Sequence, residues 1–403
     1  MCERLAATFE VHIVCGQPNS PTDDNYIRSG VQLRNGVSIH RLNHTRFAKR
    51  IPAGRVLNLL SFSKATSRYL RRTNLQSDVL VSETDPFLLP IVAAKHAEQT
   101  GAKLVCYLQD IYPDVAVAIG KAKPGRLTSQ IRSRLQSAYL ASDRVIVLAR
   151  CMRDRLANSP WSIPTEKLHV IPNWADCEVI QPLPRETNEF RKRLGLEDKF
   201  VVMHSGNMGL TQRLDVLIRA TMSDQWPANA VLLLIGDGAA RNEVESLARS
   251  VPQGRIQILP YQSRHRLGES LSAADLHVVS MHESISGCLC PSKLYGILAA
   301  GRPVLAIASD STDLAQTVLE HDIGWCCEPG DPAAIVESIA TAADAAHLLS
   351  EMGNRARLIA KDRFDRKVVM SQFESMFRAL TNHRTEPAEG VHLAPQATTT
   401  LTQ

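Results

Sequence analysis

A lysine at the start of a predicted helix is the residue in this sequence whose charge most needs an explanation. Lys293 lies in the segment CPSKLYGILAAGRPVL (290–305), where Ser292 suits the N-cap and Gly301 before Pro303 suits the helix end. The partial positive charge of a helix N-terminus repels a cation in the first turn. A bound anion would remove this conflict, which makes Lys293 a candidate phosphate ligand. The alternative is an exposed lysine that points sideways into water.

Two glycine-containing turns, each between a predicted strand and a predicted helix, could also hold a phosphate. The first turn follows the strand at 200–206 and contains Gly206 and Gly209, and the second is GDG at 236–238. Glycine lets backbone N–H groups approach an anion closely, and the helix start that follows adds favourable potential. Neither turn has dinucleotide or P-loop spacing, so chemistry of those kinds is not indicated. A plain turn without a ligand is the alternative for both.

Short apolar strands that alternate with amphipathic helices must position these turns. The expected strands lie at 9–16, 37–43, 78–84, 103–110, 144–149 and 167–173 in the first half and at 200–206, 230–236, 256–261, 276–281, 303–309 and 324–330 in the second. Such a pattern indicates parallel sheets covered on both faces. We therefore expect an α/β chain of two doubly wound, Rossmann-like domains, with the ligand in a cleft beyond the carboxyl ends of the strands.

The predicted domain boundaries follow the same pattern. The first domain is expected at 1–180 and the second at 181–364, joined through the proline-containing segment 173–186. A last helix at 365–382 is expected to cross back to the first domain. The segment 383–403 is rich in Pro, Thr, Gln and Ala without periodicity, which predicts a disordered tail.

Composition excludes several classes of protein. The chain has 403 residues, of which 44% are apolar and 22% charged, as is usual for a soluble globular protein. No apolar run approaches the roughly 20 residues that span a bilayer, and no signal-like segment opens the chain. The nine cysteines include no CxxC pair and no zinc-like spacing with histidine. We expect reduced cysteines and no metal site.

Positive charge is concentrated in the first half of the chain. The net charge is +5, but residues 1–180 contain 24 Lys and Arg against 15 Asp and Glu. The basic segments lie at 44–55, 68–72 and 120–134. They are either a solvated face or a surface for anionic lipid headgroups or phosphates. Nucleic acid fits less well, because stacking aromatic residues are not interleaved with the charges.

The motifs together resemble one family. In chain order they are IPNWAD (171–176), SGNMGLTQ (205–212), GDG (236–238), LPY (259–261), SAADLHVVS (272–280) and PSKLYGILAAGRPV (291–304). This order resembles glycosyltransferase family 4, whose members have the GT-B fold. It is most similar to the bacterial branch that transfers amino sugars or fucose-like sugars in O-antigen, capsule or colanic-acid assembly. The resemblance covers most of residues 9–380.

The resemblance implies a function. It implies a retaining glycosyltransferase of cell-surface polysaccharide biosynthesis that moves a sugar from a nucleotide donor, UDP-linked, to a lipid-linked or oligosaccharide acceptor. The expected acceptor is a polyprenyl-diphosphate-linked saccharide. No cofactor and no metal are expected, and the partners include no nucleic acid. The expected location is cytoplasmic, with peripheral contact at the inner face of the plasma membrane left open.

The resemblance also assigns residues to roles. Lys293, Gln212 and Arg213 are expected to stabilise charge on the leaving diphosphate. The donor-binding candidates are Ser205, Gly206, Asn207, Gly236, Gly238, Pro260, Tyr261, Glu283, Pro291, Ser292, Lys293 and Leu294. For Glu283, a surface position in a loop is the alternative. On the acceptor side the candidates are Glu83, Asp85, Asp110 and Asp114, and for Asp110 and Asp114 an N-cap or a surface carboxylate is the alternative.

The chain departs from the family pattern in two places. The family often has two glutamates eight residues apart that contact sugar and ribose hydroxyls, and Cys288 and Gly296 stand at those positions. The first strand and its glycine loop are also expected to be missing, because MCERLAATFEVHIV resembles the end of the first helix followed by the second strand. Three alternatives therefore stay open: a sugar-nucleotide epimerase of the same fold, an inactive glycosyltransferase-like binding protein, and a membrane-surface binding module.

Overall fold

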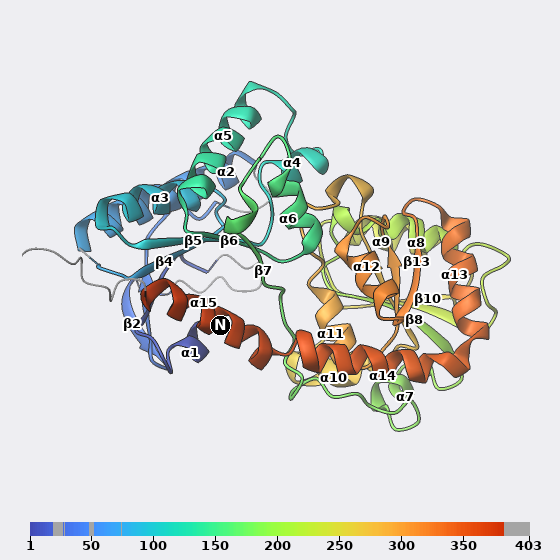
Figure 1. Cartoon of the computed structure of the whole chain (residues 1–403). Helices are drawn as coiled ribbons and strands as arrows, with labels where there is room; N and C mark the ends of the chain where they lie inside the picture. Colours follow the sequence, from blue (N-terminus) through green and yellow to red (C-terminus); the bar gives the residue numbers. More distant parts are fainter. Residues whose placement is uncertain (19–26, 28, 48–51, 74, 383–403) are drawn as a thin grey trace, which may run out of the picture.

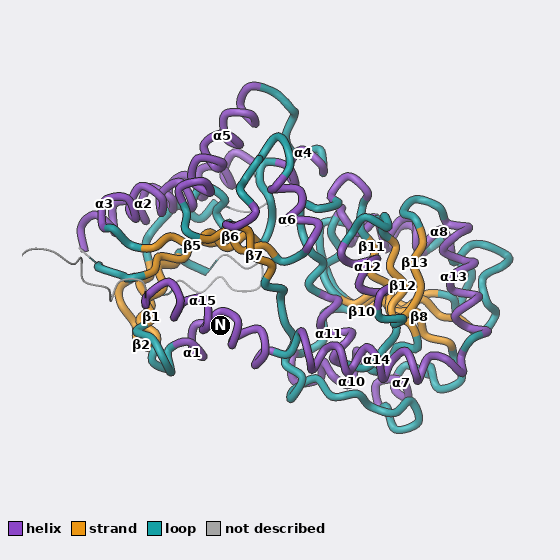
Figure 2. Tube along the Cα trace, viewed as in Figure 1, coloured by secondary structure: helices purple, strands orange, loops and turns teal. Residues whose placement is uncertain are grey.

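The computed structural model places the chain in two α/β lobes that lie side by side (Figure 1). It describes residues 1–18, 27, 29–47, 52–73 and 75–382, so the tail predicted at 383–403 lies outside the described residues. Helices surround the sheets of both lobes, as Figure 2 shows. The predicted α/β class is confirmed. No helix in the described part of the chain is long and apolar enough to cross a membrane.

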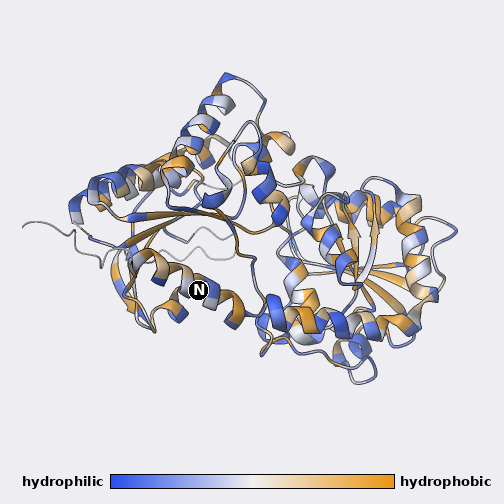
Figure 3. Cartoon of the chain, viewed as in Figure 1, coloured by the Kyte–Doolittle hydropathy of each residue, from blue (hydrophilic) through white to orange (hydrophobic). Residues whose placement is uncertain are grey.

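The second lobe is built on six parallel strands. In spatial order they are β10 (Ile256–Leu259), β9 (Ala230–Ile235), β8 (Phe200–Ser205), β11 (Leu276–Ser280), β12 (Val304–Ile307) and β13 (Gly324–Cys327). The four central strands are buried almost throughout, and Figure 3 shows the sheet of this lobe as mainly hydrophobic ribbons. Burial on both faces explains why these strands are nearly continuous apolar runs rather than alternating ones.

Helices lie before, between and after these strands, and the short ones labelled η are 3-10 helices. They are α7 (Glu189–Arg193), η2 (Leu210–Gln212), α8 (Leu214–Ala220), α9 (Arg241–Ala248), η3 (Arg264–Arg266), α10 (Leu267–Leu271), η4 (Glu283–Ile285), α11 (Lys293–Ala299), α12 (Asp313–Glu320) and α13 (Pro332–Asp344). Some helices begin with side-chain caps that satisfy backbone N–H groups. Thr312 caps α12, and Asp331 caps α13 with Pro332 in its first turn.

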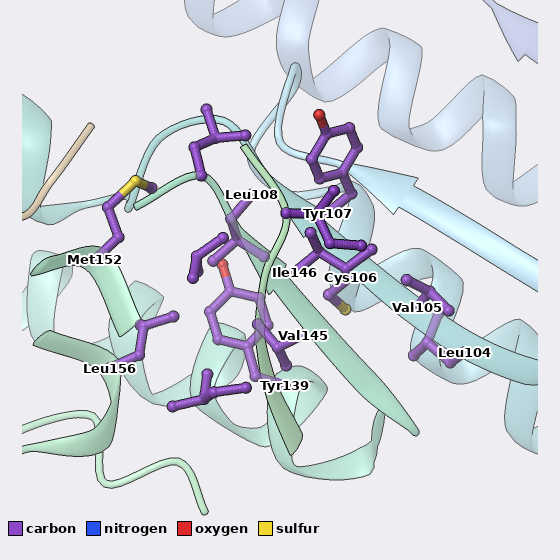
Figure 4. Packing of buried hydrophobic residues seen from close by; sticks show 14 of the residues in the cluster. Leu104, Val105, Cys106, Tyr107, Leu108, Tyr139, Val145, Ile146, Met152 and Leu156 are labelled. Carbon is purple, nitrogen blue, oxygen red and sulfur yellow. The ribbon is translucent and has the colours of Figure 1, made fainter. Parts of the chain in front are cut away.

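The larger sheet of the first lobe has four parallel strands. Their order is β4 (Val79–Glu83), β5 (Lys103–Leu108), β6 (Arg144–Val147) and β7 (Leu168–Val170). The helices that follow them are α3 (Leu89–Thr100), α4 (Asp114–Ala118), α5 (Arg126–Ala141) and α6 (Arg150–Ala157), with η1 (Thr165–Lys167) before β7. Side chains from β5, β6, α5 and α6 form one core, in which Tyr139, Ile146 and Met152 are buried (Figure 4).

The first lobe differs from the expected single doubly wound sheet. Its first strands form a separate sheet in the order β1 (Val11–Cys15), β3 (Val37–Arg41) and β2 (Gly30–Arg34). β1 and β3 are parallel, but β2 and β3 form an antiparallel hairpin that was not predicted. Asn35 and Gly36 make its two-residue turn, and both have positive φ, at 48° and 79°. Asn-Gly favours this turn because both residues tolerate the left-handed region.

The last two helices extend along both lobes. α14 (Ala346–Arg363) packs against α11 in the second lobe, and α15 (Arg366–Asn382) returns to the first lobe, where it contacts β4 and the short α1 (Cys2–Leu5) (Figure 1). Val369, Met370 and Phe373 of α15 are buried in the core of the first lobe. The only remaining helix in the described part of the chain is α2 (Pro52–Thr73), which packs beside α3.

Candidate functional site

The two lobes are in direct contact where β5 ends. The loop at 282–290 of the second lobe lies against this region, and Ile111 donates its N–H to the carbonyl of Cys288 at 2.8 Å. The hydroxyl of Ser284 donates to the carbonyl of Ala118, at 2.9 Å. The structure therefore holds residues of both predicted domains together at the carboxyl ends of their strands.

The two predicted glycine turns pack against each other at the ends of β8 and β9. The N–H of Gly206 donates to the carbonyl of Ile235 at 2.8 Å. A Cβ atom on Gly236 would lie 1.8 Å from the carbonyl oxygen of Gly206, and one on Gly238 would lie 2.5 Å from that of Met208. All three glycines have positive φ. Gly236 and Gly238 must therefore be glycine, because a Cβ atom on either would overlap the backbone of the first turn.

Lys293 reaches the first glycine turn from the start of α11. Its Nζ lies 3.8 Å from the position that a Cβ on Gly206 would take. Among the ion pairs of the described residues, none involves Lys293, and burial lowers the pKa of this amine to about 7. A negative charge close by would stabilise the ammonium form. The predicted phosphate ligand and the predicted glycine turn are thus brought together.

His204 is a member of this group that sequence reasoning missed. It lies on β8 with its side chain fully buried, and its Nε2 is 3.1 Å from Nζ of Lys293. Burial, and next the charge of Lys293, hold the pKa of His204 well below its ordinary value. The available signal was the histidine that follows the apolar run FVVM at the end of this strand.

Gln212 and Arg213, which are predicted to stabilise charge on the leaving diphosphate, have side chains that bond to their own turn. The Gln212 side chain accepts from the N–H of Gly209 at 2.8 Å and donates to Thr211 at 2.8 Å. Arg213 has positive φ and forms two hydrogen bonds with the carboxylate of Asp215, at 2.9 and 3.1 Å. Both side chains thus stabilise the turn, and their contact with the diphosphate stays a prediction.

The remaining donor-side candidates surround the two turns. Tyr261 follows Pro260 with its ring exposed, and its hydroxyl donates to the carbonyl of Asp237 at 3.1 Å. The N–H of His282 donates to the carbonyl of Thr211 at 2.7 Å, which ties the loop of the exposed Glu283 to the first turn. Asn207 and Ser292 are exposed, Ser205 and Pro291 are partly buried, and Leu294 is buried.

Among the four acceptor-side carboxylates, Glu83 and Asp110 both lie close enough to Asp85 to feel its charge. Asp85 follows Glu83 at the end of β4, and Asp110 follows β5. Burial, and next the charge of Asp85, raises the pKa of Asp110 to about 6. The same two causes raise the pKa of Glu83. The structure therefore gathers these three carboxylates at the end of the parallel sheet, beside the contact with the second lobe.

Asp114 is separate from them and has a structural role. Its buried carboxylate accepts hydrogen bonds from Arg132 at 2.9 Å, Arg155 at 3.1 Å and the indole N–H of Trp161 at 3.1 Å. Arg155 also donates to the carbonyl of Ser286 at 3.2 Å, across to the second lobe. With four hydrogen bonds from three residues on it, this carboxylate is not available to an acceptor, in contrast to the prediction.

The two positions that often carry glutamate lie in packed surroundings. Cys288 is fully buried, and its carbonyl takes part in the contact between the lobes. A Cβ on Gly296 would lie 3.4 Å from Leu271. In the part of the chain that the structure describes, no group of three or more His, Cys, Asp or Glu side chains is arranged to hold a metal ion.

Comparison with protein families matches both halves of the chain. The family described as "Glycosyltransferase Family 4" matches residues 1–179, and the one described as "Glycosyl transferases group 1" matches residues 186–359. The chain is 29% identical to "Probable glycosyltransferase WbjE" of Pseudomonas aeruginosa over 79% of this chain and 77% of that protein. It is 27% identical to WcaI of Escherichia coli K12, named as a glycosyl transferase of colanic acid biosynthesis, over 69% and 68%.

Solved structures share the fold at lower identity. Sucrose-phosphate synthase from Thermosynechococcus elongatus has a TM-score of 0.73 at 16% identity, over 95% of this chain and 92% of that chain. HepE from Anabaena, solved with UDP, has a TM-score of 0.66 at 18% identity, over 85% and 86%. These likenesses confirm the predicted GT-B arrangement of two parallel-sheet domains.

Proposed function

The chain belongs to glycosyltransferase family 4, and on that premise we propose that it transfers a sugar from UDP to a polyprenyl-diphosphate-linked saccharide with retention of configuration. The proposed setting is assembly of a bacterial surface polysaccharide, as the name of WcaI suggests for that relative. UDP is the first donor to test, because HepE was solved with UDP and with UDP-glucose.

One observation carries the donor part of the proposal: Lys293 lies against the first glycine turn without a carboxylate partner among the described ion pairs. During transfer, negative charge grows on the diphosphate that leaves the sugar. A preorganised cation at that point stabilises the transition state more than the ground state, and loss of one such contact typically costs about 2.7–4 kcal/mol. Because Lys293 supplies positive charge, we propose that no metal is required, and we expect transfer to persist in EDTA.

On the acceptor side, we assign Asp110, Glu83 and Asp85 to the region that receives the saccharide. A carboxylate there can accept the hydrogen bond of the attacking hydroxyl. The proposal of a lipid-linked acceptor, and of peripheral contact with the inner face of the membrane, rests on α2. Its exposed face combines apolar Leu57 and Leu60 with basic residues, and the helix contains no acidic residue.

The test measures binding and transfer with the same protein. Calorimetric titration with UDP-glucose and UDP-N-acetylglucosamine compares the parent with Lys293→Met, which keeps the length of the side chain but removes its charge. We expect affinity to fall about 10- to 100-fold, while Lys361→Met, an exposed position on α14, binds as the parent does. Unchanged affinity in Lys293→Met would contradict the assignment.

Transfer is then measured with a polyprenyl-diphosphate saccharide. Formation of a glycosylated acceptor is the expected result. Appearance of an epimerised donor in the absence of acceptor would instead identify an epimerase of the same fold. A protein that binds the donor but neither transfers nor epimerises the sugar would be an inactive relative.

A further inference from the structure

His204 is a buried polar side chain directly behind the lysine of the donor site. It is fully buried on β8, one residue before the strand ends at Ser205. Nζ of Lys293 lies 3.1 Å from its Nε2 and 3.4 Å from its Nδ1. The amine is thus within hydrogen-bond distance of the ring.

Charge decides which of the two groups carries the proton. Two cations at this distance in a buried site repel each other strongly, so at most one is charged. Burial, and next Lys293, holds the pKa of His204 well below its ordinary value, whereas burial lowers that of Lys293 only to about 7. The imidazole is therefore the neutral member, and a neutral imidazole accepts a hydrogen bond from an ammonium.

The other titratable groups nearby leave this assignment unchanged. His277 on β11 is also buried, and its ring bonds to the carbonyl of Leu271 at 2.9 Å. Burial lowers the pKa of His277 to about 4, so it too is neutral. Arg302 is a second cation in the surroundings, and it donates to the carbonyl of Leu183 at 2.7 Å. These groups do not supply Lys293 with a negative charge.

We propose that His204 is a positioning residue that accepts a hydrogen bond from Lys293 and directs its ammonium group at the donor diphosphate, so that donor binding draws a proton onto this lysine. The inference rests on the proposed function, since it takes the ligand at the Gly206 turn to be a nucleotide diphosphate. His204 stabilises the charged lysine without cancelling its charge. A carboxylate in its place would neutralise the cation before the donor arrived.

The inference predicts a pH dependence with a definite sign. A bound diphosphate favours the charged lysine, so binding takes up a proton wherever the free lysine is neutral. Affinity should be level below about pH 7 and should fall as the pH rises, by about tenfold per pH unit at the steepest. UDP-glucose is a suitable probe, because it lacks the terminal phosphate ionisation near pH 6 that free UDP has.

The experiment compares His204→Leu and His204→Asn with the parent by titration with UDP-glucose from about pH 6 to 9. In His204→Leu the lysine loses its acceptor, its charged form is less stable, and affinity should begin to fall at a lower pH. His204→Asn offers an amide oxygen and should restore much of the parent profile. A merely structural histidine would lower affinity equally at every pH, and equal midpoints in all three proteins would overturn the inference.

Two measurements on the parent protein do not depend on the variants folding. Calorimetry in two buffers of different ionisation enthalpy should show uptake of up to one proton per UDP-glucose at about pH 8, and none would overturn the inference. Nitrogen-15 NMR should report a neutral His204, and a doubly protonated ring would overturn it. If the parent binds no UDP-glucose at any pH, the proposed function itself fails, which is a separate outcome.

Discussion

At the scale of single residues, Gly236 tests whether the two glycine turns need their close contact. A Cβ at this position would lie 1.8 Å from the carbonyl oxygen of Gly206, so Gly236→Ala must displace one turn. We expect a loss of more than about 2 kcal/mol in the free energy of unfolding, measured by urea titration, together with weaker UDP-glucose binding.

Gly330→Ala is the matched control for this change. Gly330 also has positive φ, but nothing lies within 4 Å of the added Cβ. It should cost only the about 1–2 kcal/mol of the left-handed conformation and leave donor binding unchanged. Equal effects of the two substitutions on stability and binding would show that the contact between the turns is unimportant.

At this scale, a site residue could be predicted only where its sequence signal lies within one short segment. Gly206, Gly236 and Lys293 could be predicted because glycine at a strand end and a cation at a helix start are visible in short segments. The partner of Lys293 could not, because His204 is 89 positions away and only the sheet places it there. Asp114 was misread for the same reason: Arg132 and Trp161 come to it from separate segments.

At the scale of elements, α15 forms part of the core of the first lobe. Phe373 is fully buried, and its ring meets that of Tyr107 on β5 at a centroid distance of 5.3 Å. Phe373→Ala should lower the free energy of unfolding by about 3–5 kcal/mol. Leu358→Ala, at an exposed apolar position on α14, should cost no more than about 0.5 kcal/mol. Similar losses for the two variants in urea titration would contradict this role of α15.

Some strands could be predicted from local sequence patterns alone, and others could not. Strands of the second lobe were predictable because burial on both faces gives them continuous apolar runs. β2 was missed although Asn35-Gly36 is a strong hairpin signal, since all five of its residues are exposed and its apolar content is low. The separation of the first lobe into two sheets could not be predicted from local patterns, because it depends on which strands pair.

At the scale of the whole molecule, α2 exposes part of the positive charge that is concentrated in the first half of the chain. α2 exposes Val56, Leu57 and Leu60 near its start, and basic side chains follow along the same helix. Its exposed basic residues are Arg55, Lys64, Arg68, Arg71 and Arg72. Exposed apolar side chains beside basic ones are typical of a helix that lies on an anionic membrane surface. Such a contact would bring a lipid-linked acceptor to the first lobe.

Vesicle binding tests this surface. Each basic residue near an anionic membrane contributes about 1 kcal/mol, so the combined change of Arg68, Arg71 and Arg72 to Gln should weaken binding to phosphatidylglycerol vesicles about 100-fold. The control changes Arg219, Arg249 and Lys361 to Gln, which removes the same charge from exposed positions of the second lobe. Binding of the parent should also weaken with added salt. If both triple variants bind equally, net charge rather than α2 controls the contact, and if the parent does not bind, the surface is only a solvated face.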